Sequence, residues 1–143
     1  ELGVDGRIYC IPGHAPRVLA IDPRTDRVYP VGPTFPGKFK WLRGVAVGDV
    51  IYGLPCHADT VLRIHVPTGT ITTLPIPYDE FYPGEDKVIC NEQQAMIWKY
   101  HGGTVCPSDG CIYAIPQSAW HVLRIDPETD QVSLVPSEPL KGR

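Results

Sequence analysis

The chain has 143 residues and a formal net charge of −3, and 43% of its residues are apolar while 20% are charged. These values exclude a highly charged disordered chain and fit roughly one globular domain. Its 14 glycines and 16 prolines exclude a mostly helical protein, because both residue types disfavour helix interiors. No apolar run approaches the roughly 20 residues of a membrane helix, no signal peptide is visible, and the mild acidity argues against nucleic-acid binding.

The first element along the chain is a short apolar run that recurs twice more. Each copy contains Ile-Tyr and ends at a proline, and the copies span 5–12, 48–55 and 109–116. A second apolar run follows at a fixed offset, at 18–21, 61–64 and 122–125. A turn and a third run, at 28–31, 71–74 and 132–135, complete the unit. Short runs rich in β-branched and aromatic residues and bounded by turn residues predict β-strands.

The turn between the second and third runs repeats as well. It has the form Asp-Pro-x-Thr-Asp in two copies, and its last position holds Asp26, Gly69 or Asp130. Proline presets φ for such a turn, and the last position is where a left-handed residue would close a bulged hairpin.

A fourth run precedes the Ile-Tyr run in two copies only. It spans 40–47, beginning Lys40-Trp41, and 99–106, beginning Lys99-Tyr100. The repeated tyrosines, Tyr9, Tyr52 and Tyr113, give spacings of 43 and 61 residues, and most of the excess falls between residues 75 and 97. About 43 residues with four strands is the period of a β-propeller blade.

We therefore expect an all-β fold of four-stranded antiparallel blades, about three of them, as a partial or open propeller. Residues 1–143 would form one repeat domain. The predicted segments are a partial blade 1 at 4–36, blade 2 at 38–75, an insertion at 76–96, blade 3 at 97–136 and a tail at 137–143.

The repeats also carry a family resemblance. The strings Gly-x-Ile-Tyr and Val-Leu-x-Ile-Asp, followed by a turn and a weaker outer strand, resemble NHL- and kelch-like blades. With the Lys-Trp/Tyr start and Ile-Pro, the unit looks like a tandem repeat of uncharacterised proteins of algae and protists. The resemblance implies that the runs at 40–47 and 99–106 are innermost strands, where Gly44, Gly102 and Gly103 let backbones approach closely.

The predicted ring is incomplete, since propellers normally have four to eight blades. Three explanations stay open: a fragment of a longer propeller, a short protein that closes its ring by oligomerising, or an open stack capped by other proteins. In each case uncovered strand edges favour partner chains.

The five cysteines are scattered, and none has the spacing of a zinc cluster. Cys106 and Cys111 flank one hairpin turn and are the candidate pair for a disulfide. The alternative is that both cysteines are ordinary strand residues with no special role.

His101, at the start of an inner strand, is the best single candidate for a ligand-contacting group in a central channel. His14 and His57 share one repeat position with Ser118, so a structural turn contact explains them. We expect His121 to be solvated. No metal site is predicted, because the acidic cluster in the insertion matches no cation-binding loop.

Aromatic residues supply the candidate partner contacts. Trp120 replaces loop residues of the other copies, and the insertion adds Tyr78, Phe81 and Tyr82. Trp and Tyr concentrate binding energy at protein interfaces.

The sequence as a whole predicts a non-catalytic scaffold or protein-interaction module that needs no cofactor. It would be an accessory subunit of, or a fragment within, a larger assembly. By analogy with the algal and protist repeats, a photosynthetic or respiratory complex would fit. The alternative is a small-ligand or metal-binding propeller enzyme of lactonase or quinoprotein type. No cellular compartment follows from the sequence.

Overall fold

The computed structural model describes residues 1–77, 97–136 and 140. These residues form β-strands and connecting turns, without a helix. The strands are β1 (Ile8–Cys10), β2 (Val18–Asp22), β3 (Arg27–Val31), β4 (Trp41–Val47), β5 (Val50–Pro55), β6 (Thr60–His65), β7 (Thr70–Pro75), β8 (Tyr100–Val105), β9 (Ile112–Pro116), β10 (Leu123–Asp126) and β11 (Gln131–Leu134).

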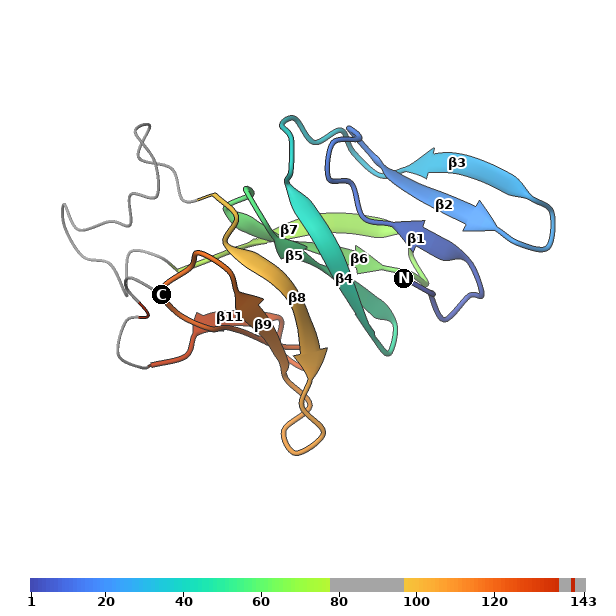
Figure 1. Ribbon diagram of the computed structural model, residues 1–143. Coiled ribbons are helices and arrows are strands. Elements are labelled where there is room, and N and C mark those ends of the chain that lie inside the picture. The colour runs from blue at the N-terminus through green and yellow to red at the C-terminus, as the bar shows by residue number, and fades with distance from the viewer. Residues whose placement is uncertain (78–96, 137–139, 141–143) are drawn as a thin grey trace.

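The strands make three antiparallel sheets, each from one continuous stretch of chain. The sheet orders are β1-β2-β3, β4-β5-β6-β7 and β8-β9-β10-β11. Figure 1 shows the three sheets, here blades 1, 2 and 3, spread like a fan with blade 2 in the centre. The inner strands β4 and β8 lie beside each other. The predicted all-β architecture of propeller-type blades is confirmed.

The predicted left-handed turn residues are also confirmed. Asp26, Gly69 and Asp130 have φ angles of 56°, 68° and 59°. Asp tolerates this conformation better than most residues with a β-carbon, because its short polar side chain bonds locally. The same backbone turn therefore closes the outer hairpin of every blade.

The residues before β1 extend the edge of blade 1. Leu2 forms a bridge with Ile8. Tyr9 N donates to Glu1 O at 2.8 Å, and the Glu1 amine donates to Tyr9 O at 2.9 Å. The first residues thus take the position beside β1 that β4 takes beside β5 in blade 2.

Two apolar cores lie between the blades. One joins blade 1 to blade 2 and contains Tyr9, Val18, Ala20, Trp41, Ile51, Leu62, Ile64, Val66 and Ile71. The other joins blade 2 to blade 3 and contains Val50, Tyr52, Leu54, Val61, Ile76, Tyr100, Ile112, Ala114, Ala119, Leu123, Ile125 and Leu134. Because successive strand residues point to opposite faces, one face of blade 2 contributes to the first core and the other face to the second.

The inner strands approach closely, as the glycines predict. A β-carbon at Gly44 would lie 2.8 Å from Glu1 Cγ, and one at Gly103 would lie 2.8 Å from Leu54 Cδ1. Gly102 has open space instead, but its φ of +80° is one that side chains disfavour. Neighbouring blades therefore pack tightly on their inner side.

Candidate functional site

Two buried lysines hold the blades together. Lys40 is 5% exposed and Lys99 is fully buried. Lys40 Nζ donates to Gly13 O at 3.1 Å and to Ala15 O at 3.0 Å, both in blade 1, and to Gly37 O at 2.9 Å. Burial lowers the pKa of the Lys40 ammonium. Because a buried ammonium is costly without partners, these carbonyls stabilise it and tie blade 2 to blade 1.

Lys99 repeats this arrangement one blade later. Its Nζ donates to His57 O at 2.9 Å and Ala58 O at 3.1 Å, both in blade 2. Asp59 Oδ1 lies 3.3 Å from the same nitrogen, as an ion pair on the exposed rim. We call this arrangement, a lysine of one blade on the loop carbonyls of the preceding blade, the lysine clasp.

The residue after each lysine anchors the clasp within its own blade. Trp41 Nε1 donates to Thr60 O at 2.7 Å, and Tyr100 Oη donates to His121 O at 3.0 Å. Thr60 and His121 hold the same repeat position. Both rings are 2% exposed. Two different aromatic residues thus perform one structural task.

The residue before each lysine is an aromatic in the left-handed region. Phe39 has a φ of 51° and Trp98 a φ of 53°. Bulky residues rarely adopt this conformation, which costs of order 1–3 kcal/mol and persists only where surrounding contacts hold it. Both residues stand directly before a clasp lysine, and the ring of each packs against a histidine of the preceding blade.

Histidines of the preceding loops pack against these aromatic rings. The ring centroids of His14 and Phe39 are 4.1 Å apart, and those of His57 and Trp98 are 4.8 Å apart. Phe39 also contacts His57 at 5.1 Å and Trp98 at 4.9 Å. We call His14, Phe39, His57 and Trp98 the aromatic row. Burial, then Lys99 and His14, lower the pKa of His57. Within the described part of the chain, its buried Nε2 has no hydrogen-bond partner.

Ser118 takes the histidine position in blade 3. Its Oγ lies 2.5 Å from Ile97 O and 2.6 Å from Trp98 O, so its single O–H can donate to either carbonyl. This repeat position therefore contacts the residues before an inner strand in all three blades, by hydrogen bonding at Ser118 and by ring packing at His14 and His57.

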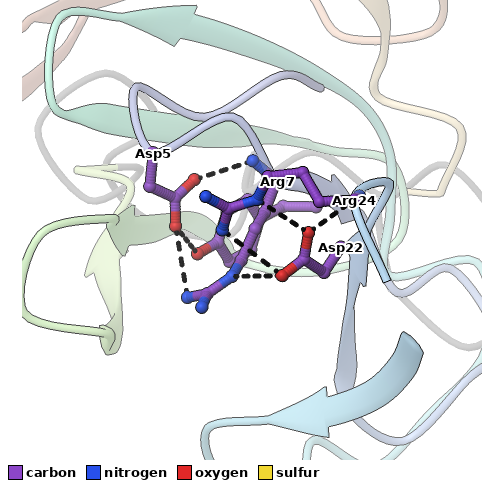
Figure 2. A network of polar contacts seen from close by, with 5 residues as sticks. Asp5, Arg7, Asp22 and Arg24 are labelled. Atoms are coloured by element: carbon purple, nitrogen blue, oxygen red, sulfur yellow. Dashed lines mark hydrogen bonds and ion pairs between the residues drawn. The ribbon is translucent and has the colours of Figure 1, made fainter. Parts of the chain in front are cut away.

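Polar contacts on the outer side differ between blades. Figure 2 shows the network of blade 1, in which Arg7 lies between Asp5 and Asp22, and Asp22 also pairs with Arg24. Tyr9 Oη donates to Asp5 Oδ2 at 2.8 Å, within the same blade. Between blades 2 and 3, Tyr52 Oη instead donates to Asp130 Oδ1 at 2.7 Å, and Arg63 Nε donates to the same oxygen at 2.9 Å.

The predicted ligand residue His101 is exposed on β8, and its Nε2 lies 3.5 Å from an Arg43 nitrogen on β4. Trp120, a predicted partner contact, is half-buried against the core between blades 2 and 3. Tyr78, Phe81 and Tyr82 lie outside the described residues. The structure therefore does not bring the predicted partner contacts together within its described part.

Two expectations are corrected. Cys106 and Cys111 are free thiols, although Cys106 N donates to Cys111 O at 2.8 Å. Their sulfurs have different neighbours, Ser108 Oγ at 3.0 Å and Asp109 O at 3.8 Å, so no disulfide joins them. His121 is buried rather than solvated, with 5% exposure, because it sits in the core-facing loop that holds Tyr100.

The faces at the two ends of the blade stack are apolar and uncovered by described residues. In blade 1, Ile8 and Val28 are 38% and 59% exposed, whereas their repeat equivalents Ile51 and Ile71 in blade 2 are 1% and 8% exposed. In blade 3, Ile115 is 56% exposed, whereas its equivalent Leu54 is 1% exposed. We call the first the blade 1 end face (Ile8, Leu19, Ile21, Val28) and the second the blade 3 end face (Tyr113, Ile115, Val122).

Within the described ranges, no group of three or more His, Cys, Asp or Glu residues could hold a metal ion. In the same ranges no helix is long and apolar enough to cross a membrane.

Comparison with known proteins identifies the fold alone. No protein-family model and no curated protein matches the chain. A solved streptogramin B lyase is similar with a TM-score of 0.62 and 14% identity, over 96% of this chain and 40% of the lyase. Virginiamycin B lyase from Staphylococcus aureus gives 0.61 and 14%, over 96% and 41%. An auxiliary nutrient binding protein from Bacteroides thetaiotaomicron gives 0.54 and 17%, over 92% and 33%. The chain thus spans less than half the length of these structures.

Proposed function

We propose that this chain is a non-catalytic protein-interaction module that binds other protein chains through its two end faces. The supporting observation is the contrast in exposure between equivalent positions. Repeat positions whose residues are buried at the two internal junctions hold exposed residues at the two end faces, which no further blade covers in the described structure. Exposed apolar faces of this kind mark association sites.

The repeat gives the two end faces the same types of residue as the two halves of an internal junction. Tyr9, Val18 and Ala20 of blade 1 pack against Ile51, Leu62 and Ile64 of blade 2. The blade 1 end face carries the equivalents of the second set. The blade 3 end face carries Tyr113 and Val122, the equivalents of Tyr52 and Val61, which are buried between blades 2 and 3. Each end face therefore presents what an internal junction buries.

Size measurement of native material and of the purified chain tests this function. We expect the native chain to elute within a larger assembly. Ile115→Glu and Val28→Glu should each release it, because a charge would be buried at the contact. Leu42→Glu is the matched control, since Leu42 is 40% exposed on β4 and outside both end faces. A native chain that elutes as a monomer, or variants that associate like Leu42→Glu, would overturn the proposal.

The competing function is a ligand-binding or lyase-type propeller, as the names of the structural neighbours suggest. The observation in its favour is His101, exposed beside Arg43 on the inner strands. A small molecule whose binding is lost in His101→Ala and retained in Ile115→Glu would favour this alternative over the interaction module.

A further inference from the structure

The lysine clasp indicates which kind of partner the blade 3 end face accepts, an inference that rests on the proposed function. Both internal junctions use the same backbone bond beside the clasp. Lys40 N donates to Gly13 O at 3.1 Å, and Lys99 N donates to Cys56 O at 3.0 Å. Gly13, Cys56 and Gln117 hold one repeat position. Each junction is therefore built from one recurring set of contacts.

The loop of blade 3 that would accept a third clasp is already folded like the loop of blade 2. Three of its amides donate to inner-strand carbonyls: Gln117 N to Lys99 O, Ser118 N to Trp98 O and Ala119 N to Lys99 O, at 2.8, 3.0 and 3.2 Å. The matching bonds in blade 2 are Cys56 N to Lys40 O, His57 N to Phe39 O and Ala58 N to Lys40 O, at 2.8, 2.8 and 3.2 Å. The carbonyls of this loop are thus held in the arrangement that binds a lysine one blade earlier.

Among the described residues, no lysine ammonium lies on the carbonyls of Gln117, Ser118 and Ala119. Lys40 and Lys99 are both engaged at the internal junctions. The loop therefore presents oriented carbonyl oxygens, which attract a cation, directly beside the apolar blade 3 end face.

We propose that the loop 117–119 and the blade 3 end face form an acceptor for a β-blade of a partner chain whose inner strand begins aromatic–Lys–aromatic. The partner's lysine lies on the loop carbonyls, its first aromatic ring packs beside Ser118 and extends the aromatic row, and its sheet covers Tyr113, Ile115 and Val122. Two observations favour this occupant over an unrelated apolar surface. A lysine ammonium complements the partial negative charge of the loop carbonyls, and both internal junctions already contain such a lysine.

A fourth blade attached to the full chain tests the acceptor without the native partner. Residues 37–75 would be copied after Arg143, so that Phe-Lys leads into a new inner strand that begins at Trp. We expect the appended amides to be protected from hydrogen exchange. Lys40→Met in the appended copy should lower that protection by about tenfold or more, since hydrogen bonds from a charged group are strong. Lys38→Met in the copy is the matched control.

The outcomes separate the inference from the proposed function. An appended blade that stays unprotected, or one equally protected with methionine in place of the clasp lysine, overturns the inference. If native material nevertheless elutes as an assembly that Ile115→Glu dissociates, the interaction function stands with a partner of different chemistry. If Ile115→Glu in the parent blade 3 leaves protection of the appended copy unchanged, the end face is not part of the acceptor.

Discussion

The two internal junctions of the molecule share the contacts around their clasp lysines, here called the inner side. They differ in the contacts around the turns that hold Gly69 and Asp130, here called the outer side. On the inner side both have a lysine clasp, an aromatic anchor and a left-handed aromatic residue. On the outer side the junction of blades 2 and 3 has the Tyr52–Asp130–Arg63 contact, whereas Gly69 replaces Asp130 and Ala20 replaces Arg63 at the junction of blades 1 and 2. Tyr9 bonds within its own blade instead.

The outer difference has a visible consequence. A pocket of about 280 Å³ lies at the junction of blades 1 and 2 and is lined in part by Arg7, Tyr9, Tyr29 and Gly69. The equivalent place at the junction of blades 2 and 3 holds the Asp130 carboxylate. Arg7 Nε is buried without a hydrogen-bond partner among the described residues and lies 3.9 Å from Asp22 Oδ2, too far for a hydrogen bond. The inner contacts are thus the constant part of this repeat, and the outer polar contacts are individual to each junction.

Removal of a clasp lysine should have the largest effect. Lys99→Met leaves the carbonyls of His57 and Ala58 without their donor, so we expect the free energy of unfolding to fall by about 2–4 kcal/mol. Lys40→Met should cost less, because Lys40 is 5% exposed, whereas Lys99 is fully buried and also pairs with Asp59. Urea unfolding measures both against exposed Lys38→Met. Equal stabilities of Lys99→Met and Lys38→Met would contradict the clasp.

Loss of the Asp130 carboxylate should break the second junction only. Burial alone would raise the pKa of Asp130, but hydrogen bonds from Tyr52 and Arg63 hold it below its ordinary value. A lowered folded-state pKa gives stability that is present above about pH 4 and lost as pH falls further. Asp130→Ala should cost about 1–2 kcal/mol at neutral pH.

Asp130→Asn is the matched variant for that experiment. It keeps an acceptor for Tyr52 but should lack the acid-dependent loss that the carboxylate confers. Acid titrations of stability that are superimposable for the parent chain and Asp130→Asn would exclude this role for Asp130.

Gly69→Asp should make the first junction more like the second. A β-carbon at Gly69 meets nothing within 4 Å, and Asp26 and Asp130 adopt the same left-handed backbone. The new carboxylate would enter the pocket beside Arg7, and we expect a stability gain of up to about 1 kcal/mol. Gly69→Asn, which lacks the charge, is the control for thermal and urea unfolding. The idea is refuted if Asn stabilises as much as Asp.

The smallest expected effect concerns His57, which touches the aromatic residues of both junctions. Burial, with Lys99 and His14, lowers its pKa, so its stability contribution is complete above about pH 6.5 and declines as pH falls. His57→Gln should flatten the stability profile between about pH 7 and 5. His121→Gln is a second probe, since burial lowers the pKa of His121 as well. An unchanged slope for His57→Gln would contradict this assignment.

Much of the fold was predictable because its signals are local. Strand runs such as Val61–Ile64 and turn positions such as Gly69 recur at fixed spacings, and a left-handed turn needs only its own few residues. The repeated Lys40-Trp41 and Lys99-Tyr100 pairs were visible too. Their meaning was not, because lysine is ordinarily exposed, and only the neighbouring blade supplies the carbonyls that allow its burial.

The site predictions were weaker for the same physical reason. Trp120 replaces loop residues of the other copies, and the sequence does not show that the core between blades 2 and 3 covers part of its ring. The sequence alone determined the number of sheets, their strand order and the positions of the turns, since neighbours along the chain specify them. The tertiary structure decided which lysines are buried, which tyrosine meets which aspartate and which apolar faces stay exposed, because those depend on contacts between blades far apart in sequence.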